Sequence, residues 1–409
     1  MKIVHTSDWH IGRTLYGRKR YEEFEAFLEW LADLLVREHV DALLVAGDVF
    51  DNSTPTNRAQ GLYYRFLRRL AGSSCRHVVI TAGNHDSPSF LNAPKELLRC
   101  LNVHVAGCIA DSPADDVLVL RNAADEPELI VCAVPYLRDR DIRTTEAGEG
   151  SDEKEVKMQQ GIQRHYQAAG EIAERHRAAT VSSIPIVAMG HLFTAGGLTV
   201  DGDGVRELYV GSLAHVGMET FPECIDYLAL GHLHVAQQTR SSILGRYSGS
   251  PLALGFSEAA QEKCVLLVEF TGRRPAVSEI AVPCFQALER IRGDWPTIAG
   301  RLAALKACGS KAWVEIVYEG DEIAGDLRER LDETTAETGI EILRVRNDRV
   351  LELALSGESG GETLEDLDIN EVFGRCLDAY NVTDEQRGPL LSAYAETVAA
   401  LDADDTNAE

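Results

Sequence analysis

Carboxylate, imidazole and amide side chains gather in five short motifs spread over the first 234 residues of the 409-residue chain. The motifs contain Asp8 and His10; Asp48 and Asp51; Asn84, His85 and Asp86; His191; and His232 and His234. One such motif alone is weak evidence, because short pairs of polar residues arise often by chance. Each motif, however, directly follows a run of apolar residues. The set therefore predicts one polar site assembled from distant parts of the sequence.

Seven of these side chains are of the kinds that hold two adjacent divalent ions. Such ions lie about 3.5–4 Å apart when one carboxylate bridges them, and Asp48 is the expected bridge. The expected ligands of one ion are Asp8, His10 and His234, and those of the other are Asn84, His191 and His232. Oxygen and imidazole ligands without a thiolate suit Mn, Fe or Zn.

The chemistry expected of such a site is hydrolysis of a phosphoester, because two ions lower the pKa of a bound water and stabilise charge on a phosphoryl group. His85, next to the ligand Asn84, is placed to protonate the leaving alkoxide, an effect typically worth about 10²–10⁴-fold. A histidine that only hydrogen-bonds a nearby carboxylate is the alternative. Asp51 and Asp86 are expected to orient histidines from behind the ligands.

Apolar runs must position these motifs. The runs cover residues 3–4, 42–46, 78–80, 184–189 and 227–230 and are typical of buried strands. Helical periodicity over residues 21–38, 58–70 and 153–178 predicts helices between them, whereas residues 110–128 are acidic and weakly patterned. This alternation favours an α/β layer architecture, in which loops meet at the carboxyl ends of strands. The predicted fold thus places the five motifs in one crevice.

The pattern of predicted strands and helices changes near residue 283. Residues 283–355 predict a small α+β domain, with strands at 285–291, 313–318 and 340–346 and helices at 296–307 and 323–338. The Gly- and Ser-rich residues 356–363 predict a flexible linker, and two short amphipathic helices follow within 364–401. Docking of this helical region on a partner and folding back onto the second domain are both possible. The acidic residues 402–409 are expected to be disordered.

Composition limits the class of protein. With 45% hydrophobic and 26% charged residues, the chain is typical of soluble globular proteins, and it lacks the run of roughly 18 apolar residues that crosses a bilayer. The first residues lack the apolar stretch of a secretory signal, so a cytoplasmic location is expected. Nine cysteines without a C-x-x-C motif predict neither disulfides nor a zinc site, and most are expected to be reduced core residues.

A formal net charge of −25 argues against simple binding to nucleic acid, which depends on neutralising phosphates with Lys and Arg. One local exception is the cationic stretch after the first motif. Its candidate DNA contacts are Arg13, Tyr16, Arg18, Lys19 and Arg20. A solvated loop leading into a helix is the alternative.

The motif set resembles that of the calcineurin-like metallophosphoesterases, and in detail the chain is similar to the bacterial SbcD nucleases. The resemblance rests on TSDWHIG (6–12), AGDVFD (46–51), AGNHDS (82–87), YVGS (209–212), GHLH (231–234) and YSGSP (247–251). It runs nearly end to end and leaves no metal-ligand position missing. It implies a four-layer sandwich of mixed sheets flanked by helices over residues 1–282, a small capping domain, and a C-terminal helical hairpin that binds a partner.

The resemblance also implies activity and partners. The family acts with Mn²⁺ on DNA ends and hairpins, as a double-strand exonuclease and single-strand endonuclease in repair and recombination. Its members pair as a homodimer within a heterotetramer and bind the coiled coil of an SbcC-type ATPase. Archaeal relatives tend to have His where this chain has Asp51, so that helper histidine is absent. A phosphatase or cyclic-nucleotide phosphodiesterase could use the same centre, and an inactive scaffold is disfavoured by the intact ligand set.

Overall fold

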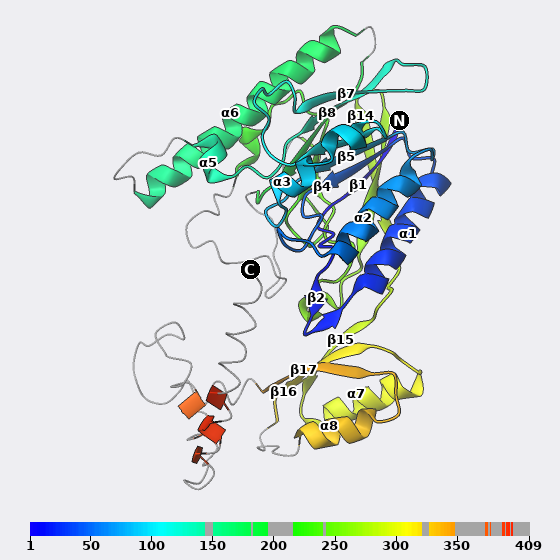
Figure 1. Cartoon of the computed structure of the whole chain (residues 1–409), viewed down its shortest axis with the longest axis vertical. Coiled ribbons are helices and arrows are strands. Elements are labelled where there is room, and N and C mark those ends of the chain that lie inside the picture. The colour runs from blue at the N-terminus through cyan, green and yellow to red at the C-terminus, as the bar shows by residue number, and fades with distance from the viewer. Residues whose placement is uncertain are drawn as a thin grey trace. The chain divides into compact units, whose positions relative to one another are not determined.

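The computed structural model describes residues 1–143, 150–180, 183–194, 216–239, 243–320 and 327–347, with a few helical positions between 373 and 395. The chain divides into two compact units, Met1–Ala287 and Leu288–Glu409 (Figure 1). The expected linker at 356–363, the acidic tail at 402–409 and the motif at 209–212 lie outside the described residues.

The first unit contains two six-stranded sheets, and the first has the order β14-β13-β1-β4-β5-β6. Its parallel strands are β1 (Lys2–Thr6), β4 (Ala42–Ala46), β5 (His77–Thr81) and β6 (Val103–Ala106). Two antiparallel strands, β13 (Cys264–Thr271) and β14 (Arg274–Ala281), complete one edge. The three expected strands at 3–4, 42–46 and 78–80 are confirmed.

The second sheet has the order β11-β12-β10-β9-β8-β7. Its strands are β7 (Val117–Arg121), β8 (Pro127–Ala133), β9 (Ile186–His191), β10 (Tyr227–Gly231), β11 (Gln237–Gln238) and β12 (Gly245–Tyr247). Strands β8, β9, β10 and β12 run parallel. Strand β7 lies within the segment that is weakly patterned in sequence, because an edge strand buries few of its side chains.

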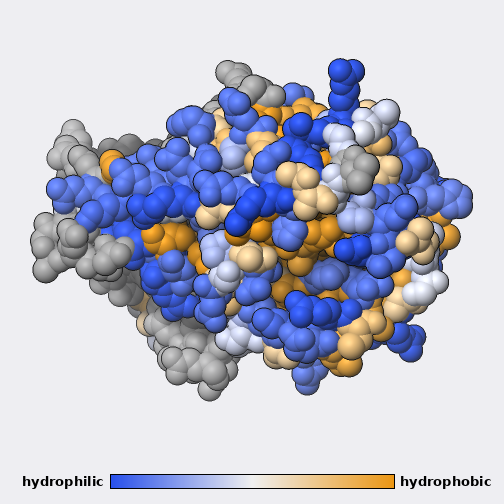
Figure 2. All heavy atoms as spheres, turned by 90° about the horizontal axis from the view of Figure 1, so that it is seen from above, coloured by the Kyte–Doolittle hydropathy of each residue, from blue (hydrophilic) through white to orange (hydrophobic). Residues whose placement is uncertain are grey.

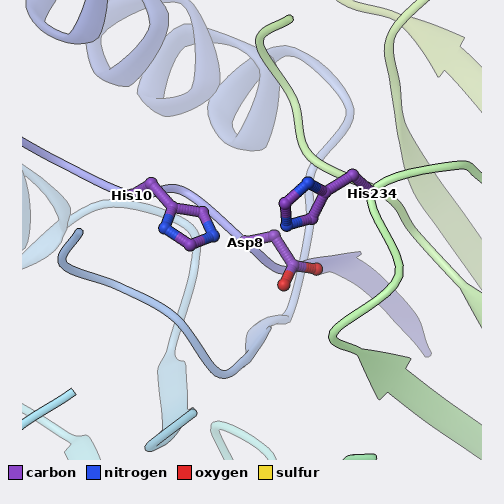
Figure 3. Close-up of side chains that lie close together, drawn as sticks. All are labelled: Asp8, His10 and His234. Carbon is purple, nitrogen blue, oxygen red and sulfur yellow. The ribbon is translucent and has the colours of Figure 1, made fainter. Parts of the chain in front are cut away.

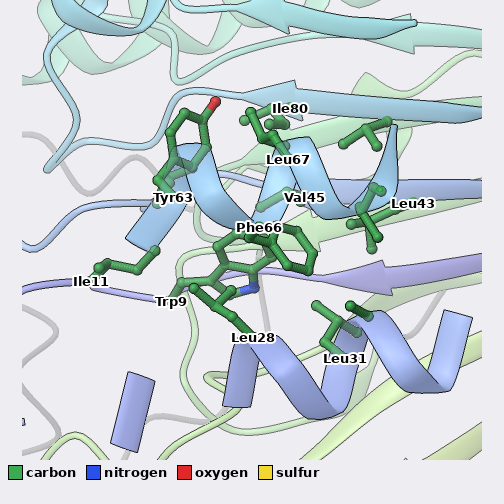
Figure 4. Close-up of a cluster of buried hydrophobic side chains, with 14 of the residues drawn as sticks. Trp9, Ile11, Leu28, Leu31, Leu43, Val45, Tyr63, Phe66, Leu67 and Ile80 are labelled. Atoms are coloured by element: carbon green, nitrogen blue, oxygen red, sulfur yellow. The ribbon is translucent and has the colours of Figure 1, made fainter. Parts of the chain in front are cut away.

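Helices cover the outer faces of both sheets, which gives four layers (Figure 1). Helices α1 (Tyr21–Arg37) and α2 (Asn57–Leu70) pack on the first sheet through Trp9, Phe27 and Phe66 (Figure 4). Helix α6 (Ser151–Ala178) packs on the second sheet. A third cluster, which includes Leu44 and Val187, fills the space between the sheets. The predicted four-layer α/β sandwich is therefore confirmed, as are the three predicted helices.

Short elements connect these layers. They are β2 (Thr14–Leu15), β3 (Arg18–Lys19), α3 (Pro88–Asn92), α4 (Lys95–Arg99), α5 (Asp139–Ile142), η1 (Met218–Thr220) and η2 (Phe256–Glu258). Helix ends are set by local chemistry: the Thr56 side chain accepts a hydrogen bond from the Ala59 amide at 3.2 Å and caps α2.

The second unit alternates strands with helices. Its elements are β15 (Leu288–Gly293), α7 (Trp295–Ala307), β16 (Trp313–Tyr318), α8 (Leu327–Thr335) and β17 (Glu341–Asn347), and the strands run parallel. These are the five elements expected from the sequence. Within 364–401 only scattered helical positions are described, and there the rings of Phe373 and Tyr394 stack with centroids 3.9 Å apart. Phe373 belongs to the first of the two predicted amphipathic helices, and Tyr394 belongs to the second.

The cysteines correct one expectation. The eight that the structure describes are all free, but only Cys75, Cys132 and Cys264 are buried, and four are exposed. Most are therefore not core residues. The face seen in Figure 2 is covered mainly by hydrophilic side chains, with small hydrophobic areas between them. Among the described residues no helix has the length and apolar character needed to cross a bilayer.

Candidate metal centre

The metal ligands predicted from the sequence stand at the carboxyl ends of strands from both sheets. Asp8 and His10 follow β1, and Asp48 follows β4. The amide of Asp8 donates to the Gly47 carbonyl at 3.0 Å, and the amide of His10 donates to the Asp48 carbonyl at 3.0 Å. These backbone hydrogen bonds hold the two loops side by side.

The backbone at several ligands has an unusual conformation. Positive φ angles occur at Asp8 (52°), His10 (47°), Asp48 (49°) and His232 (97°). Residues other than glycine rarely adopt this region, at a cost of order 1–3 kcal/mol each. The surrounding fold must therefore hold these four ligands in place.

Glycines let the loops approach one another. A Cβ on Gly231 would lie 1.9 Å from the Ala46 carbonyl oxygen, and a Cβ on Gly83 would lie 2.1 Å from Oδ1 of Asp48. Gly47 combines such a clash, 2.2 Å from His191 Nδ1, with a φ of +86°. The main requirement at Gly83 and Gly231 is thus close packing rather than a turn.

The first ligand cluster consists of Asp8, His10 and His234, whose ligand atoms all lie within 4.8 Å of one another. Figure 3 shows Asp8 and His10, from one segment, meeting His234, which lies far from them in the chain. Both ring nitrogens of His10 are buried and form no well-aligned hydrogen bond among the described residues, although the Asp51 and Asp48 carboxylates lie 3.3 and 3.5 Å away. Such burial is costly for a polar group, so a bound cation fits this position.

The second cluster surrounds His191, at the end of β9. Its Nε2 lies 3.2 Å from Oδ2 of Asp48 and 3.0 Å from Oδ1 of Asn84. The same amide oxygen lies 3.1 Å from Nδ1 of His232. His191 Nδ1 donates to the Ala46 carbonyl at 2.9 Å, so Nε2 is the nitrogen that can bind a cation.

Asp48 lies between the two clusters. Its Oδ2 is 3.5 Å from His10 Nε2 and 3.2 Å from His191 Nε2. Burial alone would raise the pKa of Asp48, but His191 and His10 outweigh it and hold that pKa well below its ordinary value. Burial likewise would lower the pKa of His191, and the Asp48 carboxylate instead raises it to about 9. Asp48 is therefore an anion in contact with both groups of imidazoles.

Comparison with known proteins agrees with this geometry. Residues 1–236 match the family model described as calcineurin-like phosphoesterase, and residues 284–381 match the one described as type 5 capsule protein repressor C-terminal domain. SbcD of Escherichia coli K12, part of the nuclease SbcCD, is 34% identical over 404 residues, which cover 98% of each chain. The chain belongs to the SbcD nuclease family.

Other members of the family match over about two thirds of the chain. The SbcD protein of Rhodobacter capsulatus is 38% identical over 280 residues, which cover 66% of this chain and 67% of the relative. That of Bacillus subtilis is 35% identical over 270 residues, which cover 66% of each chain. The resemblance inferred from the motifs is confirmed, and with it a metallophosphoesterase that uses divalent metal.

His85 lies beside His10 and Asp51 in this family member. Its Nδ1 donates to the backbone carbonyl of Asp51 at 2.7 Å, and its amide donates to Oδ1 of Asp48 at 2.9 Å. Its ring packs edge-on against His10, with centroids 4.8 Å apart. His85 is half-buried, whereas His10 is fully buried. These contacts fix the orientation of the ring, and Nε2 is the ring nitrogen on the side away from the Asp51 carbonyl.

Asp51 and Asp86 have different roles. Oδ1 of Asp51 lies 3.3 Å from Nδ1 of His10, as expected for a carboxylate that orients a histidine. Among the described residues the Asp86 carboxylate has no histidine as hydrogen-bond partner, which corrects the expectation from sequence. Its buried carboxylate accepts hydrogen bonds from the amides of Val49, Phe50 and Gly83 at 2.9–3.1 Å. It thus ties together the loops that carry Asp48 and Asn84.

The cationic stretch forms a β2–β3 hairpin, with positive φ at Tyr16 (46°) and Gly17 (80°). Arg18 and Lys19 are exposed, and the half-exposed ring of Tyr16 stacks on Phe256. Arg20 is only 2% exposed. Its guanidinium bonds Glu23 at 2.7 and 2.9 Å, so it cannot reach DNA and leaves the candidate set.

Arg13, the other end of the stretch, faces the site. It donates to the Leu254 carbonyl at 3.1 Å and to Oδ1 of Asp51 at 3.2 Å. These contacts hold the carboxylate that lies behind His10. His5 is a structural histidine: it is buried between Tyr227 Oη and the Leu230 carbonyl, at 3.0 and 3.2 Å.

Sequence reasoning missed several residues that support the ligands. Ser7 Oγ donates to Oδ2 of Asp8 at 2.5 Å and lies 2.8 Å from Ser248 Oγ. Glu258 and Lys263 lie behind His234. Ser248 belongs to the YSGSP motif (247–251), so that motif pointed to the region without giving its role. Nothing in the sequence pattern singles out Glu258, which is fully buried.

Proposed function

We propose that the chain is a two-metal DNA phosphodiesterase, the nuclease component of a cytoplasmic, ATP-dependent SbcCD-type complex that acts on DNA ends and hairpins. The observation that carries this proposal is the position of Asp48. Its Oδ2 is within 3.5 Å of imidazole nitrogens from both ligand clusters, as a bridging carboxylate requires. Membership of the SbcD nuclease family supports the choice of DNA over a small phosphoester.

The proposed ligands are Asp8, His10 and His234 for one ion and Asn84, His191 and His232 for the other, with Asp48 shared. Two divalent ions, for which we propose Mn²⁺, would lower the pKa of the attacking water and neutralise charge on the phosphate. The tautomers of His191 and His10 are set from behind by the Ala46 carbonyl and the Asp51 carboxylate. The chain itself therefore presents the ligand nitrogens in the correct orientation.

His85 is the proposed general acid. Because the Asp51 carbonyl accepts its Nδ1 proton, Nε2 can deliver a proton to the leaving 3′ or 5′ oxygen of the cleaved strand. The Asp48 carboxylate accepts the His85 amide and so couples the position of the acid to that of the proposed bridge. The proposed DNA contacts near the site are Arg13 and, on the β2–β3 hairpin, Tyr16, Arg18 and Lys19.

The region proposed to bind a partner protein belongs to the second unit of the chain. We assign residues 1–282 to the nuclease domain, 283–355 to the capping domain, 356–363 to a linker and 364–401 to docking on the coiled coil of an SbcC-type ATPase. The complex would contain two copies of each protein. The stack of Phe373 on Tyr394 supports a paired helical region as the docking element.

The first test is Mn²⁺-dependent degradation of end-labelled duplex and hairpin DNA by the purified chain and by Asp48→Ala, with p-nitrophenyl phosphate esters for comparison. We expect DNA cleavage that the substitution abolishes. Turnover of the small esters without DNA cleavage, even with the ATPase present, would support a phosphatase or cyclic-nucleotide phosphodiesterase instead.

The role of His85 is tested with His85→Ala beside His176→Ala, which removes an exposed histidine on α6. We expect His85→Ala to bind metal normally and to cleave DNA about 10²–10⁴-fold more slowly. Unchanged turnover in that variant would remove His85 from the mechanism.

The docking proposal is tested by deleting residues 364–409 and measuring co-purification with an SbcC-type ATPase. We expect association to be lost while turnover of small esters by the remaining chain is retained. Persistent association would refute the assignment of this region.

A further inference from the structure

A buried ion pair stands directly behind the ligand His234. Glu258 is 0% exposed, and its Oε1 lies 3.3 Å from Nδ1 of His234. Its other oxygen, Oε2, lies 2.6 Å from Nζ of Lys263. Oε2 also accepts hydrogen bonds from the Leu254 amide at 3.1 Å and the Ser250 hydroxyl at 3.2 Å. Three donors therefore fix one oxygen, and the other is directed at the ligand.

Lys263 holds the backbone of the same ligand. Its Nζ donates to the carbonyl oxygen of His234 at 3.2 Å and to Ser250 Oγ at 3.0 Å, in addition to Glu258. The pair thus contacts His234 at both its ring and its main chain. A carboxylate against Nδ1 keeps the proton on that nitrogen and leaves Nε2 to bind a cation. The contact of Glu258 Oε1 with the His234 ring therefore points to a role in positioning this ligand, in addition to stability.

The two ligand clusters differ in what lies behind their histidines. In the first cluster, His10 and His234 each face a carboxylate, from Asp51 and Glu258, at 3.3 Å. In the second, His191 Nδ1 faces the neutral Ala46 carbonyl, and His232 Nδ1 lies 3.1 Å from the neutral amide oxygen of Asn84. A carboxylate makes the imidazole more electron-rich and a better ligand than a neutral acceptor does. The surroundings therefore favour cation binding in the first cluster.

We propose that Glu258 and Lys263 are a positioning pair that sets the orientation of His234 and makes the ion bound by Asp8, His10 and His234 the tighter of the two. This inference rests on the two-ion assignment of the proposed function. It goes beyond that assignment, because it makes the two ion positions unequal and names the residues responsible.

The experiment measures Mn²⁺ binding to the full chain without DNA, by isothermal titration calorimetry and electron paramagnetic resonance. The variants are Glu258→Gln and the double variant Glu258→Gln with Lys263→Met, which leaves no unpaired buried charge. The matched control is Glu262→Gln, which makes the same charge change at an exposed side chain next to Lys263. Thermal unfolding of the metal-free proteins checks that each variant is folded.

We expect wild type and Glu262→Gln to bind two ions with unequal affinity. Both Glu258 variants should lose about 10–100-fold at the tighter site and keep the affinity of the weaker one. Equal weakening of both sites, or no change at either, would overturn the inference while leaving two-ion binding intact. Binding of a single ion by the wild-type chain would instead overturn the two-metal proposal itself.

Discussion

Removing the Asp86 carboxylate should destabilise the first unit, because Asp86 joins two loops through backbone hydrogen bonds. Oδ2 accepts from the amides of Val49 and Gly83, and Oδ1 accepts from that of Phe50. Asp86→Ala leaves these three buried donors without a partner. At about 1–3 kcal/mol for each, the loss is roughly 3–9 kcal/mol.

A second effect acts in the opposite direction. Burial and the nearby Asp48 charge raise the pKa of Asp86 to about 6, so removing this carboxylate relieves repulsion with Asp48. We therefore expect the lower end of the range, about 3 kcal/mol, which is a large part of a typical stability of about 5–15 kcal/mol. Asp86→Asn keeps one acceptor oxygen and should cost less, about 1–3 kcal/mol.

The assay is guanidinium-induced unfolding of the metal-free chain, followed by circular dichroism, with Asp115→Ala as the control for an exposed carboxylate. We expect wild type and Asp115→Ala to be equally stable, Asp86→Asn to be less stable, and Asp86→Ala to be the least stable. Equal unfolding midpoints for wild type and Asp86→Ala would refute the argument that these three hydrogen bonds hold the loops.

Two further predictions concern the metal ligands. In the metal-free protein the pKa of His191 is raised to about 9, so a cation must displace the proton on this ring. The affinity for metal should therefore rise about tenfold per pH unit up to about pH 9 and then level off. Calorimetry in buffers of different ionisation enthalpy measures the released proton, and a flat profile between pH 7 and 9 would contradict this. Gly231→Ala should abolish metal binding and cost at least about 1–3 kcal/mol, because its Cβ would lie 1.9 Å from the Ala46 oxygen; Gly300→Ala, where the space is open, should do neither.

The sequence predicts the fold well because the apolar runs are short, buried and separated by clear helical periodicity. Strands such as β4, whose five residues are all buried, are recognisable from composition alone. Strand β7 is half-exposed at a sheet edge, and its mixed pattern gives no such signal. The same limit applies to the cysteines: the exposed Cys100 and Cys308 lie at the ends of α4 and α7, where the residue type alone does not reveal burial.

The ligand set is recognisable because each motif follows a strand, but its supporting contacts are not. Glu258 reaches His234 across 24 positions of sequence through a short 3-10 turn, and a glutamate in such a turn is ordinarily taken as exposed. Asp86 fits the motif pattern, yet its partners are backbone amides, which no residue type reveals. Arg20 is hidden by its pairing with Glu23, so a run of cations in the sequence overstates the charge available on the surface.

The division of the ligands between two sheets has a mechanical consequence. Asp8, Asp48 and Asn84 follow strands of the first sheet, and His191 and His232 belong to the second. With the proposed ligands, each ion would be a reversible cross-link between the two sheets. Its binding would add about 2.7 kcal/mol to the free energy of unfolding when the free metal concentration is a hundredfold above the dissociation constant. Removing the metal with a chelator would break the link between the two sheets. The protease resistance of the whole sandwich should therefore show whether metal is bound.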